Sequence, residues 1–195
     1  TERLTDQNHY YNLNLKLQKG SNVLITGEQG SGKTSLLKWI MGEIEAKGQL
    51  FLDDKPLVNR NPRKLLKVGI TLVPEMGSVF PDLTVRENLF LSLTLGRNNS
   101  NDLETDFFFK DLQHLLDLKG YVLSGGQLKM LSLMMGFNTN PKFLLLDEPF
   151  SGLSSRPITE LYKKITTLNN RGVGVVVTGE TGNIEPADFK NVVNL

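Results

Sequence analysis

The stretch Gly27-Glu28-Gln29-Gly30-Ser31-Gly32-Lys33-Thr34 decides the fold of this 195-residue chain. It matches the pattern G-x-x-x-x-G-K-[S/T], follows a short β-branched run at residues 23–26 and precedes a segment of helical character at residues 35–40. In a glycine-rich loop between a strand and a helix, successive backbone amides point at phosphate oxygens and the helix dipole adds to them. The sequence therefore predicts a phosphate-binding loop on an α/β core.

The residue types of this loop suit a nucleoside triphosphate. Lys33 would bring a point charge to the phosphates, and the Thr34 hydroxyl would ligate Mg²⁺. We predict that the other residues of the loop and the first turn of its helix line the same phosphates: Gly27, Glu28, Gln29, Gly30, Ser31, Gly32 and Ser35.

A second motif supplies carboxylates. Residues 143–148 form an apolar run that ends in Asp147 and Glu148, at the end of a strand where open α/β sheets bind their ligands. This looks like a Walker B motif, in which Asp147 would hold Mg²⁺ through its water shell and Glu148 would polarise the attacking water as general base. The alternative is a plain acidic pair at a strand end, which the upstream phosphate-binding loop disfavours.

A third motif, Leu123-Ser124-Gly125-Gly126-Gln127, precedes a periodic apolar segment at residues 128–137. Ser124 can cap that helix with Gln127 at the reciprocal position. Gly125 and Gly126 leave backbone amides free to approach a γ-phosphate, while Ser124 can donate to its oxygens. The pattern predicts a second anion-binding helix end, and a mere helix cap is the alternative.

The rest of the chain predicts one domain whose core is split by a helical insert. The middle carries a Thr-x-x-Glu capping pattern at residues 84–87, helical spacing at 102–118 and an exposed polar loop at 96–101. We assign residues 1–75 and 140–195 to the core and 76–139 to the helical subdomain. Further strands are expected at 50–52, 69–73, 173–178 and 191–193, with a helix at 157–168.

The composition of the chain excludes several classes of partner and of binding site. The 22 lysines and arginines nearly balance 21 aspartates and glutamates, so the chain has no basic field for nucleic acid. It has no cysteine, which excludes disulfides, thiolate zinc sites and cysteine-ligated clusters. No apolar run approaches the roughly 20 residues of a membrane span and no leader stands at the start, so we expect membrane contact through a partner.

The three motifs in this order resemble the ATP-binding cassette family over nearly the whole chain. The resemblance implies an α/β P-loop NTPase fold: a RecA-like core with a small antiparallel β portion and an inserted helical subdomain. In that family ATP lies between one subunit's P-loop and the other subunit's signature motif, which is residues 123–127 here. It thus implies a Mg²⁺-dependent ATPase that closes head-to-tail as a homo- or heterodimer.

Membrane transport is the commonest function of the family, and it implies both the partners and the location of this chain. The partners would be membrane-spanning permease subunits. The ATPase would lie in the cytoplasm, peripheral on the inner face of the cell membrane. Two other functions stay open: a soluble non-transport cassette and a low-turnover regulatory one. About 90 residues separate Lys33 from Ser124, which leaves no room for a long coiled-coil or zinc insertion and opposes the soluble class.

Three positions depart from the family pattern. Glu75 stands where a glutamine usually contacts Mg²⁺ and the permease; a carboxylate can still ligate the metal, and Val73-Pro74-Glu75 is similar to branched-chain amino-acid importer ATPases. Ser154 replaces the aspartate of the loop that crosses the dimer interface. Glu180 occupies the place of a histidine that touches the γ-phosphate, and its negative charge puts efficient turnover in question.

The remaining aromatic and histidine side chains predict packing or surface positions. By its spacing from Lys33, the adenine-stacking aromatic of the family falls near Leu4. A shortened N-terminal loop could bring Tyr10 into stacking range, but Tyr10 and Tyr11 are expected to pack a strand. Trp39 follows the periodicity of the first helix and is expected in the core. His9 and His114 are expected at the surface or in packing, away from the site.

Overall fold

The computed structural model describes residues 3–6, 9–12, 15–76, 78–95, 107–180 and 184–195. The predicted loop at 96–101 and the start of the predicted helix at 102 lie outside these ranges, as do the side chains of His9, Tyr10 and Tyr11. None of the helices within the ranges combines the length and apolarity that a membrane span requires.

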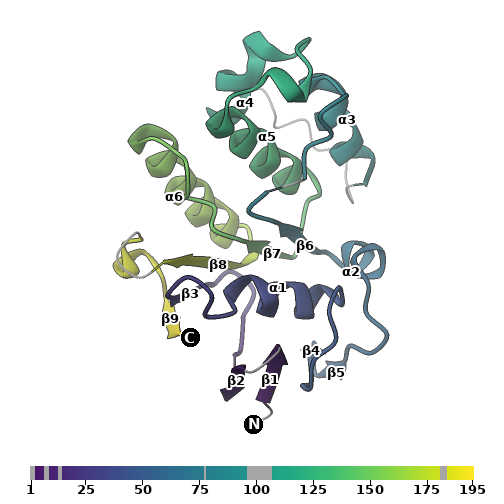
Figure 1. The fold of residues 1–195 in the computed structure, drawn as a ribbon, viewed down its shortest axis with the longest axis vertical. Coiled ribbons are helices and arrows are strands. Elements are labelled where there is room, and N and C mark those ends of the chain that lie inside the picture. The colour runs from purple at the N-terminus through teal and green to yellow at the C-terminus, as the bar shows by residue number, and fades with distance from the viewer. Residues whose placement is uncertain (1–2, 7–8, 13–14, 77, 96–106, 181–183) are drawn as a thin grey trace.

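A parallel sheet forms the centre of the fold. In the described ranges it has five strands in the order β6-β7-β8-β3-β9 (Figure 1). Because all of its pairings are parallel, the carboxyl ends of the strands meet at one edge. The strands are β3 (Asn22–Gly27), β6 (Ile70–Val73), β7 (Phe143–Leu146), β8 (Gly174–Glu180) and β9 (Asn191–Asn194).

The inner strands β3, β7 and β8 are buried on both faces, which explains their apolar runs, whereas the edge strand β9 is mostly exposed. In β3, Val23 and Ile25 pack with α1 (Lys33–Met41), whereas Leu24 packs into the opposite core. That second core also contains apolar side chains of α5 (Gly125–Asn138) and α6 (Ser155–Asn170). The sheet therefore separates two apolar cores, with α1 on one face and α6 on the other (Figure 1).

A group of helices lies beyond the sheet on the α6 side. It contains α3 (Val85–Leu95), α4 (Phe107–Leu112) and α5 (Figure 1). The capping pattern before α3 forms as predicted, since Thr84 N donates to Glu87 Oε2 (2.7 Å) and Glu87 N donates to Thr84 Oγ1 (3.2 Å). After α4 the chain continues as 3-10 turns, Gln113–Leu115 and Gly120–Val122, so the predicted helix ends well before residue 118.

Two antiparallel pairs complete the strands of the described ranges. β1 (Arg3–Asp6) pairs with β2 (His9–Asn12), and β4 (Phe51–Leu52) pairs with β5 (Lys55–Pro56). Asp53 and Asp54 join the second pair with φ angles of 50° and 61°, which suit a tight two-residue turn.

Helix α2 (Pro62–Val68) lies in a charged stretch and was not predicted from the sequence. Its boundaries carry local signals that could have revealed it. Asn61 caps its N-terminus by accepting from Lys64 N (2.9 Å), proline occupies the first turn, and Gly69 ends it with φ of 95°.

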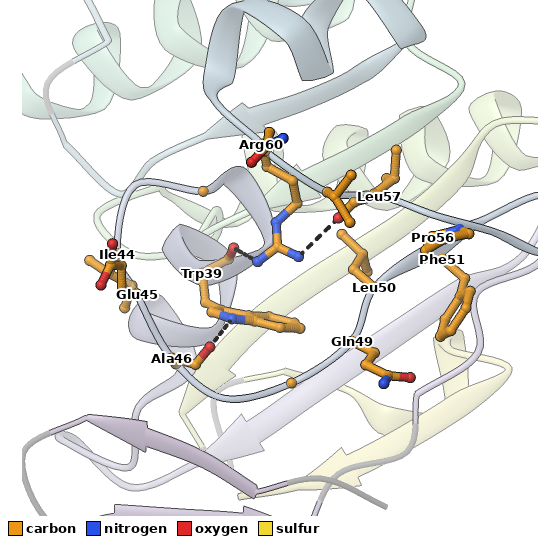
Figure 2. A pocket seen from close by; sticks show the side chains of 14 residues that line it. Trp39, Ile44, Glu45, Ala46, Gln49, Leu50, Phe51, Pro56, Leu57 and Arg60 are labelled. Carbon is orange, nitrogen blue, oxygen red and sulfur yellow. Dashed lines mark hydrogen bonds between the residues drawn. The ribbon is translucent and has the colours of Figure 1, made fainter.

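Trp39 lies in the core, as predicted, at the end of α1. Its indole Nε1 donates to Ala46 O (3.2 Å), and the Arg60 guanidinium lies 4.5 Å above the ring. These residues line a groove of about 790 Å³ together with residues of β4 and β5. Figure 2 shows the side chains that line it. His114 is exposed, also as predicted.

We predict that Gly136→Ala destabilises the fold. Gly136 lies in α5 against β6, and an added Cβ would overlap the Val73 side chain. Overpacking of this kind costs about 1–3 kcal/mol, measurable as a lower free energy of unfolding in urea. The matched control is Gly125→Ala on the same helix, where an added Cβ meets nothing within 4 Å. Equal unfolding free energies for the two variants would contradict the prediction.

Candidate active site

The loop at residues 27–34 connects β3 to α1 and is built to receive an anion. Gly30 and Gly32 adopt left-handed backbone conformations, with φ of 81° and 95°, and no side chain caps α1 at Gly32. Ser31 Oγ is a buried hydroxyl without a hydrogen-bond partner among the described residues. A helix end without a cap and an unsatisfied hydroxyl both fit phosphate oxygens.

Lys33 ties this loop to the carboxylate centre. Its buried Nζ donates to the carbonyls of Gly27 (2.9 Å) and Glu28 (3.1 Å) and lies 3.4 Å from Glu148 Oε1. The Lys33 ammonium group, at the end of the loop, therefore contacts both the start of the loop and the segment that follows β7.

Asp147 is the centre of a hydrogen-bond chain across the carboxyl ends of the strands. Its buried Oδ1 accepts from Thr34 Oγ1 (3.1 Å) and from Thr178 Oγ1 (2.7 Å). The Thr178 hydroxyl in turn accepts from Glu148 N (3.0 Å). A carboxylate beside a hydroxyl is a hard oxygen pair that fits Mg²⁺, which proteins usually bind through one or two carboxylates plus substrate phosphates.

Glu148 has a strained backbone conformation and a carboxyl group whose pKa is shifted. Its φ of 44° is left-handed, which is uncommon for a residue with a side chain. Burial raises the pKa of its carboxyl group; the Lys33 cation opposes this, while Asp147 and Glu180 add to the increase. A carboxyl group with a raised pKa suits proton transfer near neutral pH.

The third motif forms the N-terminus of α5. Gln127 N donates to Ser124 Oγ (3.3 Å) and Ser124 N donates to Gln127 Oε1 (2.9 Å), so the predicted capping box is present. Ser124 and Gly125 are exposed, and an added Cβ on Gly125 would meet only open space. This helix end is thus open to an anion from outside the chain.

A family model for ABC transporters matches residues 10–151. This chain belongs to the ABC transporter family. The chain, called the cassette below, is therefore an ATP-binding ATPase with an α/β P-loop fold. The predicted fold class and the predicted ATPase activity are confirmed.

Curated relatives from several organisms agree with the assignment. The cassette is 32% identical to the lipopolysaccharide export system ATP-binding protein LptB of Haemophilus influenzae, over 85% of this chain and 71% of that protein. It is 28% identical to the probable branched-chain amino acid transport ATP-binding protein LivG of Methanocaldococcus jannaschii, with the same coverage. The ribose import ATP-binding protein RbsA of Lactococcus lactis is 31% identical, but the cassette spans only 35% of its length.

Solved structures agree as well. A dimeric bacterial ABC transporter cassette superposes with a TM-score of 0.79 at 25% identity, over 95% of this chain and 86% of that one. A nucleotide-free ATP-binding cassette from an ABC transporter gives a TM-score of 0.73 at 25% identity, over 93% and 79%.

The structure brings most of the predicted site residues together. Gly27 and Lys33 are buried in the loop; Ser31, Gly32, Thr34 and Ser35 are half-buried; and Glu28, Gln29 and Gly30 are exposed. Glu180 ends β8 directly opposite Gly27 in the strand register. Glu75 is exposed after β6, and its carbonyl accepts a hydrogen bond from α5. The signature residues lie apart on α5, where Gly126 adjoins the carbonyl of Gly152.

Thr178 was not predicted as a site residue, although a strand was predicted at residues 173–178. The only local signal was a hydroxyl residue near the carboxyl end of a run of valines, where ligand-binding groups gather.

We predict that Thr178→Val lowers both ATP turnover and stability. The substitution keeps the side-chain volume but removes the acceptor of Glu148 N and a donor to Asp147. An unsatisfied buried donor costs about 1–3 kcal/mol of unfolding free energy, and displacement of Glu148 should lower kcat by about tenfold or more. Thr178→Ser, which retains the hydroxyl, is the matched control for urea unfolding and phosphate release. If valine and serine variants turn over ATP equally, the hydroxyl has no role.

Proposed function

We propose that this cassette hydrolyses ATP with Mg²⁺ in a head-to-tail dimer and thereby powers a membrane transporter. The observation that carries the proposal is the presence of two anion-binding surfaces on one chain. The loop at residues 27–34 contains a buried lysine, whereas the signature at residues 124–127 presents open backbone on a different helix. A second copy in reverse orientation supplies the surface that each bound ATP lacks.

Within each site the residues divide the work. Lys33 neutralises charge on the β- and γ-phosphates, and the loop amides orient them. Thr34 and Asp147 would hold Mg²⁺, with Glu75 as a further candidate ligand; the ion when bound neutralises phosphate charge. Glu148, held at the end of β7, accepts the proton of the attacking water. Ser124, Gly125, Gly126 and Gln127 bind the γ-phosphate held by the opposite protomer.

A low-turnover regulatory cassette is the second candidate function, and Glu180 favours it. Its carboxylate contributes to the raised pKa of Glu148 and lies across from the start of the phosphate-binding loop. A negative charge at this place disfavours the build-up of phosphate charge during hydrolysis. Measured turnover of the unmodified chain distinguishes the two candidates.

We predict that Glu148→Gln traps the ATP-bound dimer. Glutamine preserves the shape of the side chain but cannot take a proton from water, so binding continues while hydrolysis stops. With Mg·ATP, size-exclusion chromatography should show a dimer for the variant, and phosphate release should fall by about 100-fold or more relative to the unmodified chain. Gly125→Ala combined with Glu148→Gln should prevent the dimer. Equal phosphate release by the Glu148 variant and the unmodified chain would remove Glu148 from the mechanism.

An exposed apolar surface fits the proposed permease. Phe80 and Tyr121 are 54% and 64% exposed, and the hydrogen bond from Tyr121 N to Pro81 O (3.1 Å) joins their segments. Buried Asn88 fixes the backbone of Phe80, accepting from its N (2.8 Å) and donating to its O (3.0 Å). Large apolar side chains held exposed on a rigid backbone are typical of protein interfaces. This surface would hold the cassette at the inner face of the membrane.

We predict that Phe80→Ser with Tyr121→Ser abolishes membrane association in the native cell. Asn88 binds the backbone of Phe80 and not its side chain, so the substitution should leave these bonds in place. The purified variant should therefore keep the ATPase activity of the unmodified chain. Fractionation of a tagged chain measures the loss from the membrane pellet. Phe51→Ser is the matched control, since Phe51 is also 54% exposed but lies on the β4 hairpin. Retention of the double variant in the pellet would place the permease contact elsewhere.

A further inference from the structure

Lys129 is a buried cation of α5 that bridges the two loops of the catalytic centre. It follows the signature residues on the same helix and is 9% exposed. Its Nζ donates to Glu75 O (2.9 Å), after β6, and to Glu148 O (3.0 Å), after β7. One ammonium group therefore ties three elements together.

The charges around Lys129 explain how a lysine is tolerated there. Burial lowers the pKa of its ammonium group, whereas the carboxylates of Glu75, Asp147 and Glu148 favour the charged form. A buried charge is costly unless it is hydrogen-bonded and compensated by opposite charge, and Lys129 has two backbone acceptors and three carboxylates that favour its charged form.

The bond to Glu148 acts on a residue whose backbone is strained. The left-handed φ of 44° persists only where surrounding contacts hold it. Thr178 accepts from the N–H of Glu148, while Lys129 Nζ (3.0 Å) and Ser151 N (3.2 Å) both donate to its carbonyl, so the polar groups of its backbone are fixed. These bonds orient the backbone of Glu148, and Lys33 Nζ lies 3.4 Å from its carboxylate.

We propose that Lys129 is a positioning residue for ATP hydrolysis, holding Glu148 in register with the helix that carries the signature motif. The proposal rests on the proposed function of Glu148 as general base. Because α5 begins at the signature, contact of Ser124 and Gly125 with the opposite protomer's ATP and the placement of Glu148 then belong to one connected unit.

Lys129→Met tests this directly, because methionine fills the space of the lysine stem but has neither charge nor donor. We expect kcat to fall by about tenfold or more while KM for ATP changes by less than about threefold, since the phosphate-binding residues are untouched. Lys129→Arg, which restores a charged donor, should recover at least part of kcat. In the Glu148→Gln background, Lys129→Met should still form the ATP-bound dimer.

The matched control is Lys164→Met. Lys164 is a half-buried lysine of α6 whose Nζ lies 5.2 Å from the ring of Phe137 on α5, so it contacts the same helix far along from the signature. Its kcat should equal that of the unmodified chain.

Three outcomes would overturn the inference: a kcat for Lys129→Met within about twofold of the unmodified chain, an equal loss in Lys164→Met, or loss of the ATP-bound dimer in the Glu148→Gln background. If Lys129→Met does not fold, Lys129→Gln replaces it under the same criteria. An unmodified chain without ATP turnover, or with turnover equal to that of Glu148→Gln, would instead refute the proposed function.

Discussion

The parallel register of β8 with its two neighbours is the constraint on which the site depends. Leu146 of β7 pairs with Val177 of β8, so the residues that come next, Asp147 and Thr178, lie side by side. On the other side of β8, Glu180 pairs with Gly27 of β3. The hydroxyl of Thr178 therefore reaches both Asp147 and the backbone of Glu148. A slip of one residue would turn Thr178 toward the opposite face of the sheet. Apolar packing on both faces, which fixes that register, thus also fixes the chemistry.

Charge balance is the second constraint on the same edge of the sheet. Asp147 and Glu148 bring negative charge into a largely buried place, and each by itself would carry a desolvation cost. Lys33 and Lys129 approach from opposite sides, one from the loop after β3 and the other from α5. Because removal of one member leaves another buried charge without compensation, the centre behaves as a unit rather than as separate residues.

The motifs were predictable from sequence because their function is encoded locally. Each motif defines its own backbone geometry: a glycine-rich loop, an apolar run that ends in two carboxylates, and Ser124 with Gln127. Thr178 and Lys129 have no such pattern, because a threonine in a strand and a lysine in a helix are ordinary residues. Their roles arise only when β7, β8 and α5 meet, and pairing across elements is not visible in one sequence.

The two proposed anion-binding surfaces differ in charge, and this difference would explain why ATP is needed for the proposed dimer to close. The loop at residues 27–34 combines amides and a helix end with the full charge of Lys33. The signature offers the helix end, two glycines and the Ser124 hydroxyl, which are weaker attractions at an exposed place. A phosphate would therefore bind the loop first, and the signature would add binding energy only to a phosphate already held in place.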